Sequence, residues 1–416
     1  MPGVDNDSVT TRADAEALDA ADPLAALRER FTLPDGVIYL DGNSLGALPR
    51  STPDRLAAAV RYEWGERLIR SWNEAGWWSA SRRVAGLLAP LLGCAAGEVV
   101  VADSTSVNLF KLLLAGLRMR PGRPVVVAER GAFPTDVYIA RSVAEVSGGA
   151  LRLIDGPDDL PSALDGHTGA VLLSHVDFRT GAMWPAAETT ASVHDAGALM
   201  VWDLCHSTGA LNVRLRDWNA DMAVGCGYKY LNGGPGAPSY AFVAAEHHSD
   251  LHTPLPGWHG HADPFAMSPD YVPAQGIGQL AGGTPPVLSL LALETAVEAL
   301  TSVSTTELRA KSVRLTSFFI DLITEKCPLL EVVTPRAADQ RGSQVALRFT
   351  SAYELIQALI ERDVIGDFRA PDIARFGFAP AYSRFTDVWD AVAHIADLVD
   401  TGQYRADRFA NRSTVT

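Results

Sequence analysis

The chain has 416 residues, of which 47% are hydrophobic and 20% charged, and its formal net charge is −14 at pH 7. This composition is typical of a globular protein, and the length predicts one large domain with a smaller one. The acidic balance argues against nucleic acid as a partner, because phosphate binding needs a basic face. The longest apolar run, 84–97, contains Pro90 and is too short to cross a bilayer, so we expect no membrane partner.

Cysteine usage and the first residues indicate a cytoplasmic protein. The first 23 residues are acidic and lack the apolar core of a signal peptide. The four cysteines show no CxxC spacing and stand at 94, 205, 226 and 327. We expect them to be reduced. Cys205 and Cys226 are expected to be buried packing residues, with redox sensing as the alternative.

In chain order, residues 1–20 are expected to form a flexible tail, and 21–49 an N-terminal segment that packs with the small domain. A helical, tryptophan-rich stretch follows and begins the large domain, 50–295. Short β-branched runs then alternate with helical ones, which predicts an α/β domain with a mostly parallel sheet. The seven runs are 99–103, 124–129, 151–155, 170–177, 199–203, 221–226 and 239–245.

The pattern changes near Pro285. One long helical stretch is predicted from 287 to about 326, crossing into a small C-terminal domain, 296–416. Few strands with helices to one side predict that this domain is α+β. Its expected elements are strands at 345–349, 365–369 and 374–378 and helices at 351–362 and 386–400.

Polar residues follow several predicted strands directly. The segment DSTS (103–106) begins a helix, Asp203 ends a strand with His206 three residues later, and Lys229 follows another strand. Taken singly, these could be a helix cap, an ion-pair partner and a core histidine, and Phe133 could be core. In an open α/β sheet, however, ligands bind at the carboxyl ends of the strands.

Together these residues suit pyridoxal phosphate. The cofactor needs a lysine for a Schiff base and an acid that keeps its pyridine nitrogen protonated, for which Lys229 and Asp203 are candidates. Its phosphate suits the helix start at Thr105 and Ser106, where free N–H groups and the helix dipole favour an anion. Phe133 can stack on the cofactor ring.

The chain resembles the kynureninases, a family of pyridoxal phosphate enzymes with the aspartate-aminotransferase-like fold type I. The lysine loop GCGYKYLNGGPGAP (225–238) is highly specific, and generic class V aminotransferases lack it. The resemblance implies a seven-stranded, mostly parallel sheet in the large domain and a homodimer with shared active sites. The other matching segments are IYLDGNSLGALP (38–49), DSTSVNLFKLL (103–113), GAFPTD (131–136), HVDFRTG (175–181), WDLCHSTGALNV (202–213), GWHGH (257–261) and GDFRAPDIARFGF (366–378).

The resemblance also implies roles for the matching residues. The implied catalytic residues are Lys229, Tyr228 and Asp203. The implied cofactor-binding residues are Thr105, Ser106, Phe133, Asp136, Asp203, His206, Tyr228, Lys229, Trp258 and Thr284. Of these, Trp258 and Thr284 would reach across the dimer interface. The implied substrate-binding residues are Arg375, which would grip the α-carboxylate, Trp64 and Ser44.

The implied reaction is hydrolytic Cβ–Cγ cleavage of L-kynurenine to anthranilate and L-alanine, a step of tryptophan catabolism and NAD biosynthesis. Trp64 and Thr284 resemble the bacterial form, with fewer polar partners for a ring hydroxyl. We therefore expect kynurenine to be preferred over 3-hydroxykynurenine. His259 stands where a second aromatic residue is expected, so a ring-modified kynurenine remains an alternative substrate.

Three other hypotheses remain. A cysteine desulfurase or class V aminotransferase would share the fold, and Cys327 is the only late cysteine that a desulfurase could use. A non-catalytic binding protein is disfavoured because Lys229 and Asp203 are both present. No metal is expected, since the spacing of the histidines at 247, 248, 252, 259 and 261 matches no closed zinc-ligand set.

Overall fold

The computed structural model describes residues 11–412. Its larger part is built on a seven-stranded sheet with the strand order β4-β10-β9-β8-β7-β5-β6. The pairs from β6 to β9 are parallel, and β10 is antiparallel to both of its neighbours. The expected seven-stranded, mostly parallel sheet is therefore confirmed. Its strands are β4 (Val99–Val101), β5 (Val125–Glu129), β6 (Ala150–Ile154), β7 (Thr168–Ser174), β8 (Leu199–Asp203), β9 (Met222–Gly225) and β10 (Tyr240–Val243).

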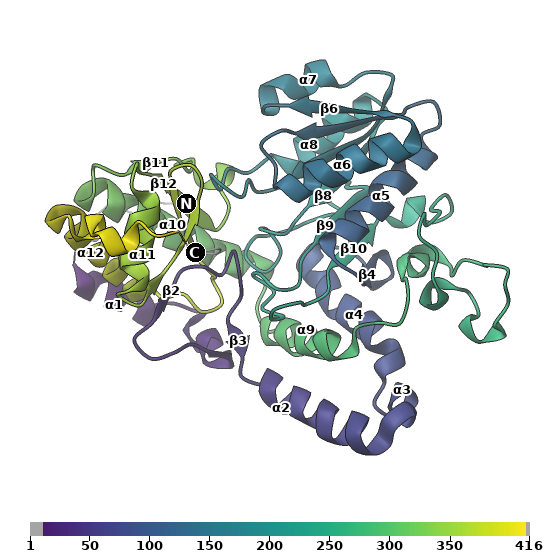
Figure 1. Cartoon of the computed structure of the whole chain (residues 1–416), viewed down its shortest axis with the longest axis horizontal. Helices are drawn as coiled ribbons and strands as arrows, with labels where there is room; N and C mark the ends of the chain where they lie inside the picture. The colour runs from purple at the N-terminus through teal and green to yellow at the C-terminus, as the bar shows by residue number, and fades with distance from the viewer. Residues whose placement is uncertain (1–10, 413–416) are drawn as a thin grey trace.

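Helices cover both faces of this sheet (Figure 1). Alternate residues of a strand join different cores: Val126 belongs to the core that contains Leu112 of α5, and Val127 belongs to the core that contains Leu88 of α4. Burial on both faces explains why the strands are near-continuous apolar runs. The covering helices are α4 (Ala80–Leu92), α5 (Thr105–Met119), α6 (Pro134–Ser147), α7 (Leu160–Ala163), α8 (Ala186–Asp195) and α9 (Val287–Leu300).

A separate hydrophobic core lies in the C-terminal part, at the left of Figure 1. An antiparallel sheet with the order β11-β12-β15-β14 packs there against three helices. The domain boundaries at residues 50 and 296 stay predictions. The elements are α10 (Thr305–Lys326), β11 (Glu331–Val332), β12 (Gln344–Arg348), α11 (Ala352–Ile360), β13 (Val364–Ile365), β14 (Asp367–Arg369), β15 (Ile373–Gly377) and α12 (Phe385–Thr401).

The N-terminal segment corrects one expectation. Residues 1–10 of the expected flexible tail lie outside the described residues, but Arg12–Ala20 forms helix α1, capped by a Thr11–Asp14 capping box. This helix packs on α12. In the following segment, β2 (Ile38–Tyr39) pairs with β13 of the C-terminal part. Leu27 and Phe31 instead join the core of the large part, so the segment 21–49 bridges the two.

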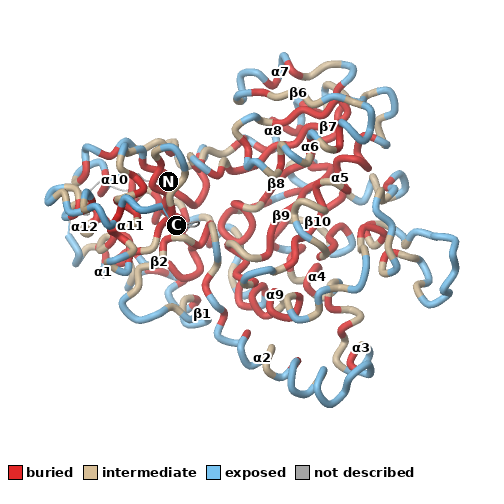
Figure 2. Tube along the Cα trace, viewed as in Figure 1, coloured by how far each residue is buried: buried red, intermediate tan, exposed pale blue. Residues whose placement is uncertain are grey.

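The remaining short elements complete the N-terminal third and the loops. The strands β1 (Phe31–Thr32) and β3 (Leu48–Pro49) pair with each other. Helix α2 (Thr52–Ala58) continues as a π-helix, Ala59–Arg67, which lies along the exposed lower edge of Figure 2, and α3 (Ser71–Glu74) follows. Short 3₁₀ turns are found at Ala25–Arg30, Leu68–Arg70, Trp77–Ser79, Ala96–Glu98, Pro157–Asp159, Ala245–His247, Trp258–Gly260, Pro264–Ala266, Gly276–Leu280, Ala338–Gln340, Gln403–Arg405 and Asp407–Phe409.

The prediction of a single long helix over 287–326 is wrong. The stretch forms α9 and α10, separated at 301–304 and bent by 81°. Ser304 and Glu307 form a capping box that starts α10. Within 11–412 no single helix is long and apolar enough to span a membrane. The α9–α10 pair meets that test only when its two bent helices are taken together.

Candidate active site

A cavity of about 210 Å³ opens at the carboxyl ends of β8 and β9. It brings together eight of the residues predicted to bind the cofactor, although they come from four separate stretches of the chain. It is lined by Ser104, Thr105, Ser106, Phe133, Thr135, Asp136, Ser174, Val176, Phe178, Asp203, Cys205, His206, Cys226, Tyr228, Lys229, Ala237 and Ser239.

Lys229 is the only one of the chain's four lysines that lines this cavity. Lys111 is buried and forms an ion pair with Asp103. Lys311 is buried against Asp22, with 2.7 Å between Nζ and Oδ2. Lys326 lies in the last turn of α10 and does not line the cavity. The amine that a covalently bound aldehyde cofactor needs is therefore available at a single place.

The lysine loop is held in place by close backbone contacts. The N–H of Gly46 donates to the Tyr228 carbonyl over 2.8 Å. A Cβ on Gly46 would lie 2.3 Å from the Lys229 carbonyl oxygen, so only glycine permits this approach. Farther along the loop, Gly234 and Gly236 have φ angles of +82° and +76°, which favour glycine. The glycines thus let the chain turn sharply after Lys229 while the segment 41–46 packs against it.

His206 lies beside the lysine as a neutral imidazole. Its Nε2 atom is 3.0 Å from Lys229 Nζ and 3.1 Å from the Asn43 carbonyl oxygen. Burial lowers the pKa of His206 well below its ordinary value, and the charges of Lys229 and Arg375 lower it further. The ring is therefore a hydrogen-bonding and packing group rather than a cation.

Asp203 and Asp136 form a buried carboxyl pair. Asp203 ends β8, and its Oδ1 accepts from the Cys205 N–H over 2.8 Å. Asp136, in the first turn of α6, is hydrogen-bonded to Asp203 and accepts from Ser174 Oγ over 3.2 Å. Burial, and then the charge of Asp203, raise the pKa of Asp136 well above its ordinary value. Asp136 is therefore the neutral acid of this pair.

The part of the cavity wall that is formed by the start of α5 suits a phosphate. Thr105 and Ser106 form the first turn of α5, whose N-cap Ser104 accepts from the Val107 N–H over 3.4 Å. The free N–H groups of this 15-residue helix and its dipole favour an anion there. Tyr228 adds a hydroxyl to the same cavity, and burial raises its pKa, so it keeps its proton.

Phe133 stands at the mouth of the cavity. Its side chain is 46% exposed, and it packs edge-on against Phe178 with 5.4 Å between ring centroids and an interplanar angle of 87°. Lys229 Nζ lies 5.9 Å from the Phe133 ring centroid. A flat aromatic cofactor fits this arrangement: an amine, a carboxylate, an anion-binding helix start and an aromatic face surround one cavity.

Arg375 lies next to this cavity but not in its lining. It is 1% exposed, and its Nε donates to Asp367 Oδ1 over 2.8 Å. Its Nη2 donates to Ser44 Oγ over 2.9 Å and to the second oxygen of Asp367. Arg369 also pairs with Asp367, at 2.7 Å. Arg375 and Ser44, both predicted to bind substrate, thus contact each other, and the guanidinium is already held by a carboxylate.

Asp367 is the residue that sequence reasoning missed. It stands directly opposite Arg375 in the antiparallel β14–β15 pairing. The motif GDFRAPDIARFGF contains both residues, and a β-hairpin reading of it would have signalled the pair.

Besides Arg375 and Ser44, which lie next to the cavity, three other predicted residues are absent from its lining and are exposed. Trp64 lies on the π-helix and is 57% exposed. Trp258 is 38% exposed and packs on Trp78 with 5.3 Å between ring centroids. Thr284 is exposed in the loop before α9. The single chain does not bring these residues to Lys229.

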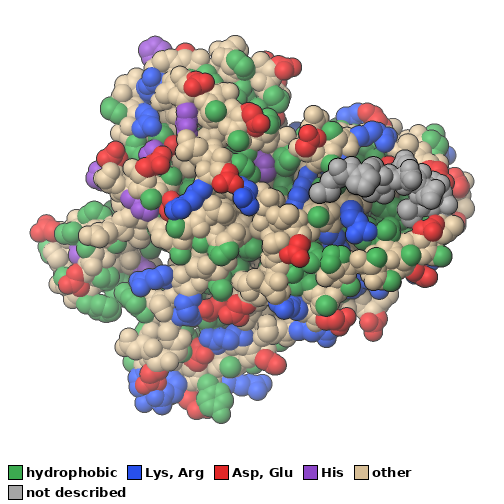
Figure 3. All heavy atoms as spheres, turned by 180° about the vertical axis from the view of Figure 1, so that it is seen from behind, with side chains coloured by type: hydrophobic (Ala, Val, Ile, Leu, Met, Phe, Trp, Pro, Cys, Tyr) green, Lys and Arg blue, Asp and Glu red, His purple; other side chains and the backbone are tan. Residues whose placement is uncertain are grey.

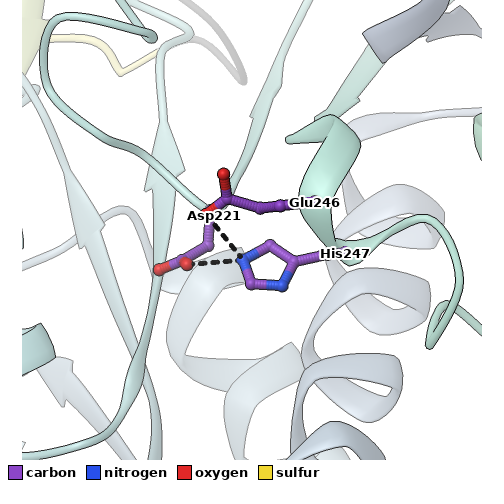
Figure 4. Close-up of side chains that lie close together, drawn as sticks. All are labelled: Asp221, Glu246 and His247. Carbon is purple, nitrogen blue, oxygen red and sulfur yellow. Dashed lines mark hydrogen bonds and ion pairs between the residues drawn. The ribbon is translucent and has the colours of Figure 1, made fainter.

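A second cluster of titratable groups lies at the other end of β8 and β9 (Figure 4). Asp221 accepts from His247 Nε2 over 2.7 Å and from His194 Nε2 over 2.8 Å, and Glu246 stands beside His247. Asp221 also accepts from the Met200 N–H over 2.7 Å. Asp221 thus accepts hydrogen bonds from three groups, and these bonds connect the start of β8 to the segments that contain His194 and His247.

Comparison with known proteins identifies relatives along nearly the whole chain. A family model described as "Kynureninase C-terminal domain" matches residues 308–395. A curated "Kynureninase" of Burkholderia pseudomallei (strain 1106a) is 50% identical over 414 residues, covering 98% of this chain and 100% of the relative. A "Kynureninase" of Pseudomonas fluorescens is 47% identical over 416 residues, with the same coverage.

Solved structures with lower identity share the fold. The cysteine desulfurase CsdA of Escherichia coli superposes with a TM-score of 0.76 at 19% identity, covering 91% of this chain and 98% of its own. The structure of C-DES with glycine covalently linked to its PLP cofactor gives a TM-score of 0.78 at 18% identity, covering 89% and 99%. At these identities the likeness shows the fold type alone.

Proposed function

Because the chain belongs to the kynureninase family, we propose that Lys229, Asp203 and Tyr228 are the residues that carry out its reaction. The protein is a pyridoxal-phosphate-dependent hydrolase that cleaves the Cβ–Cγ bond of L-kynurenine to give anthranilate and L-alanine. The observation that carries this assignment of residues is the position of Lys229, which alone among four lysines lines the cavity beside Asp203.

The residues around the cavity would hold the cofactor at each of its functional groups. Lys229 would hold it covalently through Nζ, and Asp203 would pair with its ring nitrogen. Thr105, Ser106 and Tyr228 would bind its phosphate. Phe133 would stack on the ring, and Asp136 and His206 would lie at its edges. When bound, pyridoxal phosphate supplies an electron sink for negative charge at the substrate α-carbon.

The side chains of the chain would move the protons of the reaction. Lys229 Nζ is the proposed base that takes the proton from the substrate α-carbon. Tyr228 keeps its phenolic proton, because burial raises its pKa. It is the proposed donor of the proton that Cβ receives when the Cβ–Cγ bond breaks and L-alanine forms. His206 stays neutral and is the proposed hydrogen-bonding partner of Lys229 Nζ.

Arg375 is the proposed ligand of the substrate α-carboxylate. A guanidinium suits a carboxylate because its N–H groups bind both oxygens at once. Asp367 already pairs with the Arg375 guanidinium. A substrate carboxylate would therefore bind the guanidinium alongside Asp367 or displace Asp367 from one of its N–H groups. Ser44, 2.9 Å from the guanidinium, would complete the carboxylate site.

We propose that the active protein is a homodimer with shared active sites. Trp258 and Thr284 lie outside the cavity of their own chain, and both are exposed. Large apolar side chains are also exposed near Trp258, between residues 255 and 272. Figure 3 shows hydrophobic side chains on the part of the surface that projects at its left. These apolar side chains are Leu255, Phe265, Met267, Tyr271 and Val272. A partner chain would bury this surface and bring Trp258 and Thr284 to the partner's phosphate.

We propose L-kynurenine rather than its 3-hydroxy form as the better substrate. Trp64 and Thr284 offer few polar partners for a ring hydroxyl, and leaving that hydroxyl buried and unpaired costs about 1–3 kcal/mol. His259 departs from the aromatic residue expected there, so a ring-modified kynurenine is the alternative. We further propose a cytoplasmic role in tryptophan catabolism and NAD biosynthesis, which rests on family membership alone.

The fold-related alternatives fit less well. A desulfurase needs a cysteine on an accessible loop, but Cys327 is 1% exposed at the end of α10. Purified protein with added cofactor should release fluorescent anthranilate from L-kynurenine and no sulfide from cysteine. Lys229→Ala should abolish anthranilate release, whereas Lys326→Ala should not. A protein that takes up no cofactor and releases no anthranilate would contradict the proposed residue roles.

A further inference from the structure

Two of the four cysteines lie side by side at the floor of the cavity. In the parallel β8–β9 pairing, Asp203 stands opposite Val224, and the Leu204 N–H donates to the Val224 carbonyl over 2.8 Å. Cys205 comes two residues after the end of β8, and Cys226 comes directly after the end of β9. Neighbouring strands are about 4.8 Å apart, which is within the range of Cα separations found in disulfides. Both residues line the cavity.

Side-chain contacts agree with this proximity. Each thiol lies close enough to the other to shift its pKa. The Sγ of Cys226 also lies 3.8 Å from the Cys205 carbonyl oxygen. Both cysteines are free, and the other two cysteines of the chain, Cys94 and Cys327, belong to other parts of the fold.

The surroundings of Cys226 favour a reactive sulfur. Burial opposes ionisation, but the hydrogen bond from Cys205, the charge of Lys229 and the Lys229 N–H together lower the pKa of Cys226. The Tyr228 side chain interacts with the same sulfur. The pKa of Cys205 is instead raised well above its ordinary value, first by the hydrogen bond with Cys226 and then by burial. One sulfur is thus suited to attack an oxidant and the other to resolve the product.

We propose that Cys205 and Cys226 form a reversible disulfide when the cofactor is absent, and that this bond opposes cofactor uptake. The inference rests on the proposed placement of the cofactor in this cavity. Cys205 Sγ lies 3.8 Å from Thr105 Oγ1, and Cys226 contacts Tyr228, so the pair touches two proposed phosphate ligands. Bound cofactor would cover the two sulfurs, and a disulfide would pull them away from those ligands.

The oxidant is a peroxide, and the step balances with two electrons. The sulfur of Cys226 attacks one peroxide oxygen, the O–O bond breaks, and a sulfenic acid and water form. The sulfur of Cys205 then attacks the Cys226 sulfur, the S–O bond breaks, and a second water leaves. Both thiol protons end in water, the two sulfurs are oxidised and hydrogen peroxide is reduced. A dithiol reductant reverses the bond by exchange.

The test compares cofactor-free and cofactor-loaded protein treated with hydrogen peroxide. After alkylation of the remaining thiols and digestion, mass spectrometry should find the peptides of Cys205 and Cys226 joined in cofactor-free protein. In loaded protein the joined species should form several-fold more slowly. Oxidised cofactor-free protein should regain its visible cofactor absorbance slowly, and dithiothreitol should restore the normal rate.

Matched variants separate the possible outcomes. Cys205→Ala should abolish the joined peptides and the slow cofactor uptake, while Cys94→Ala should leave both unchanged. Absence of the joined peptides in oxidised cofactor-free protein, or slow uptake that persists in Cys205→Ala, would overturn the proposal. A disulfide that forms equally fast with and without cofactor would count against the proposed cofactor placement rather than against the thiol pair.

Discussion

The carboxyl group of Asp136 is hydrogen-bonded to that of Asp203, and the two share one side of the cavity. Burial and the neighbouring charge raise the pKa of Asp136 well above its ordinary value, so Asp136 is the neutral partner. Asp136 is neutral because two adjacent buried carboxylates would repel each other. Asp203 is the member of the pair that we propose to face the cationic ring nitrogen.

This difference between the two residues predicts unequal effects of the same substitution at the two positions. Asp136→Asn keeps a neutral hydrogen-bonding group and should change kcat only several-fold. Asp203→Asn removes the charge that keeps the ring nitrogen protonated and should lower kcat by at least about a hundredfold. Anthranilate fluorescence measures both. Equal losses in the two variants would contradict the assignment.

A second prediction concerns Arg375. Arg375→Ala should raise KM for L-kynurenine strongly, because losing one partner of a buried charge pair costs about 2–5 kcal/mol. Asp367→Asn should raise KM less, because the guanidinium stays but loses the carboxylate that orients it. Both residues are buried, so thermal unfolding must be followed alongside kinetics. Arg408→Ala, on an exposed ion pair with Glu361, is the control. An unchanged KM in Arg375→Ala would refute the proposed carboxylate site.

The sequence predicted the large sheet well and the small elements less well. All seven strands were placed to within a few residues, because burial on both faces makes each a continuous apolar run. The break before α10 and the helix α1 were missed, although capping-box signals stand at Ser304–Glu307 and Thr11–Asp14. Those signals are short, and apolar periodicity continues across the α9–α10 break.

The candidate site shows the same contrast. Residues directly after strands, such as Asp203 and Lys229, could be predicted to meet because parallel strands end at one edge of a sheet. The pairing of Asp367 with Arg375 depends on the register of a hairpin, which residue types alone do not reveal. The place of Trp64 on a π-helix that leaves it 57% exposed was equally out of reach. Its proposed contact with substrate depends on a partner chain or on movement of that helix.

Substrate choice provides a third prediction. L-Kynurenine should have a higher kcat/KM than 3-hydroxykynurenine, by a factor of about ten or more, because the added hydroxyl would lack a buried partner. Steady-state assays with both compounds and with other ring-substituted analogues measure this ratio. An equal or higher value for the hydroxylated compound would reject the proposed preference. A clear preference for another ring substituent would favour the alternative substrate and draw attention to His259.

The cluster around Asp221 predicts a pH-dependent contribution to stability. Burial alone would raise the pKa of Asp221, but hydrogen bonds from His194, His247 and the Met200 N–H lower it to about 2. Its folded-state pKa lies below the ordinary 3.8, so this carboxylate stabilises the fold above about pH 4 and stops doing so as the pH falls through 2. The pKa of His194 is raised, mainly by its hydrogen bond to Asp221, so its contribution is present below pH 6.5 and is lost as the pH rises through the raised value.

Asp221→Asn should therefore lower the free energy of unfolding by about 2 kcal/mol near pH 6 and by less near pH 9, because the contribution of His194 declines as the pH rises through its raised pKa. Urea denaturation at the two pH values measures the difference. Asp217→Asn, which removes an exposed ion pair with Arg214, is the matched control and should change stability little. A loss that is the same at both pH values would contradict the proposed role of His194.

The attachment point of the cofactor tests most directly whether Lys229 is the lysine that binds it covalently. Protein loaded with pyridoxal phosphate can be reduced with borohydride, digested and analysed by mass spectrometry, which locates the modified lysine among the four that the chain contains. We expect the pyridoxyl group on Lys229, and no modification at the buried Lys111 and Lys311 or at Lys326. Stoichiometric modification of any of those three lysines, with Lys229 unmodified, would contradict it.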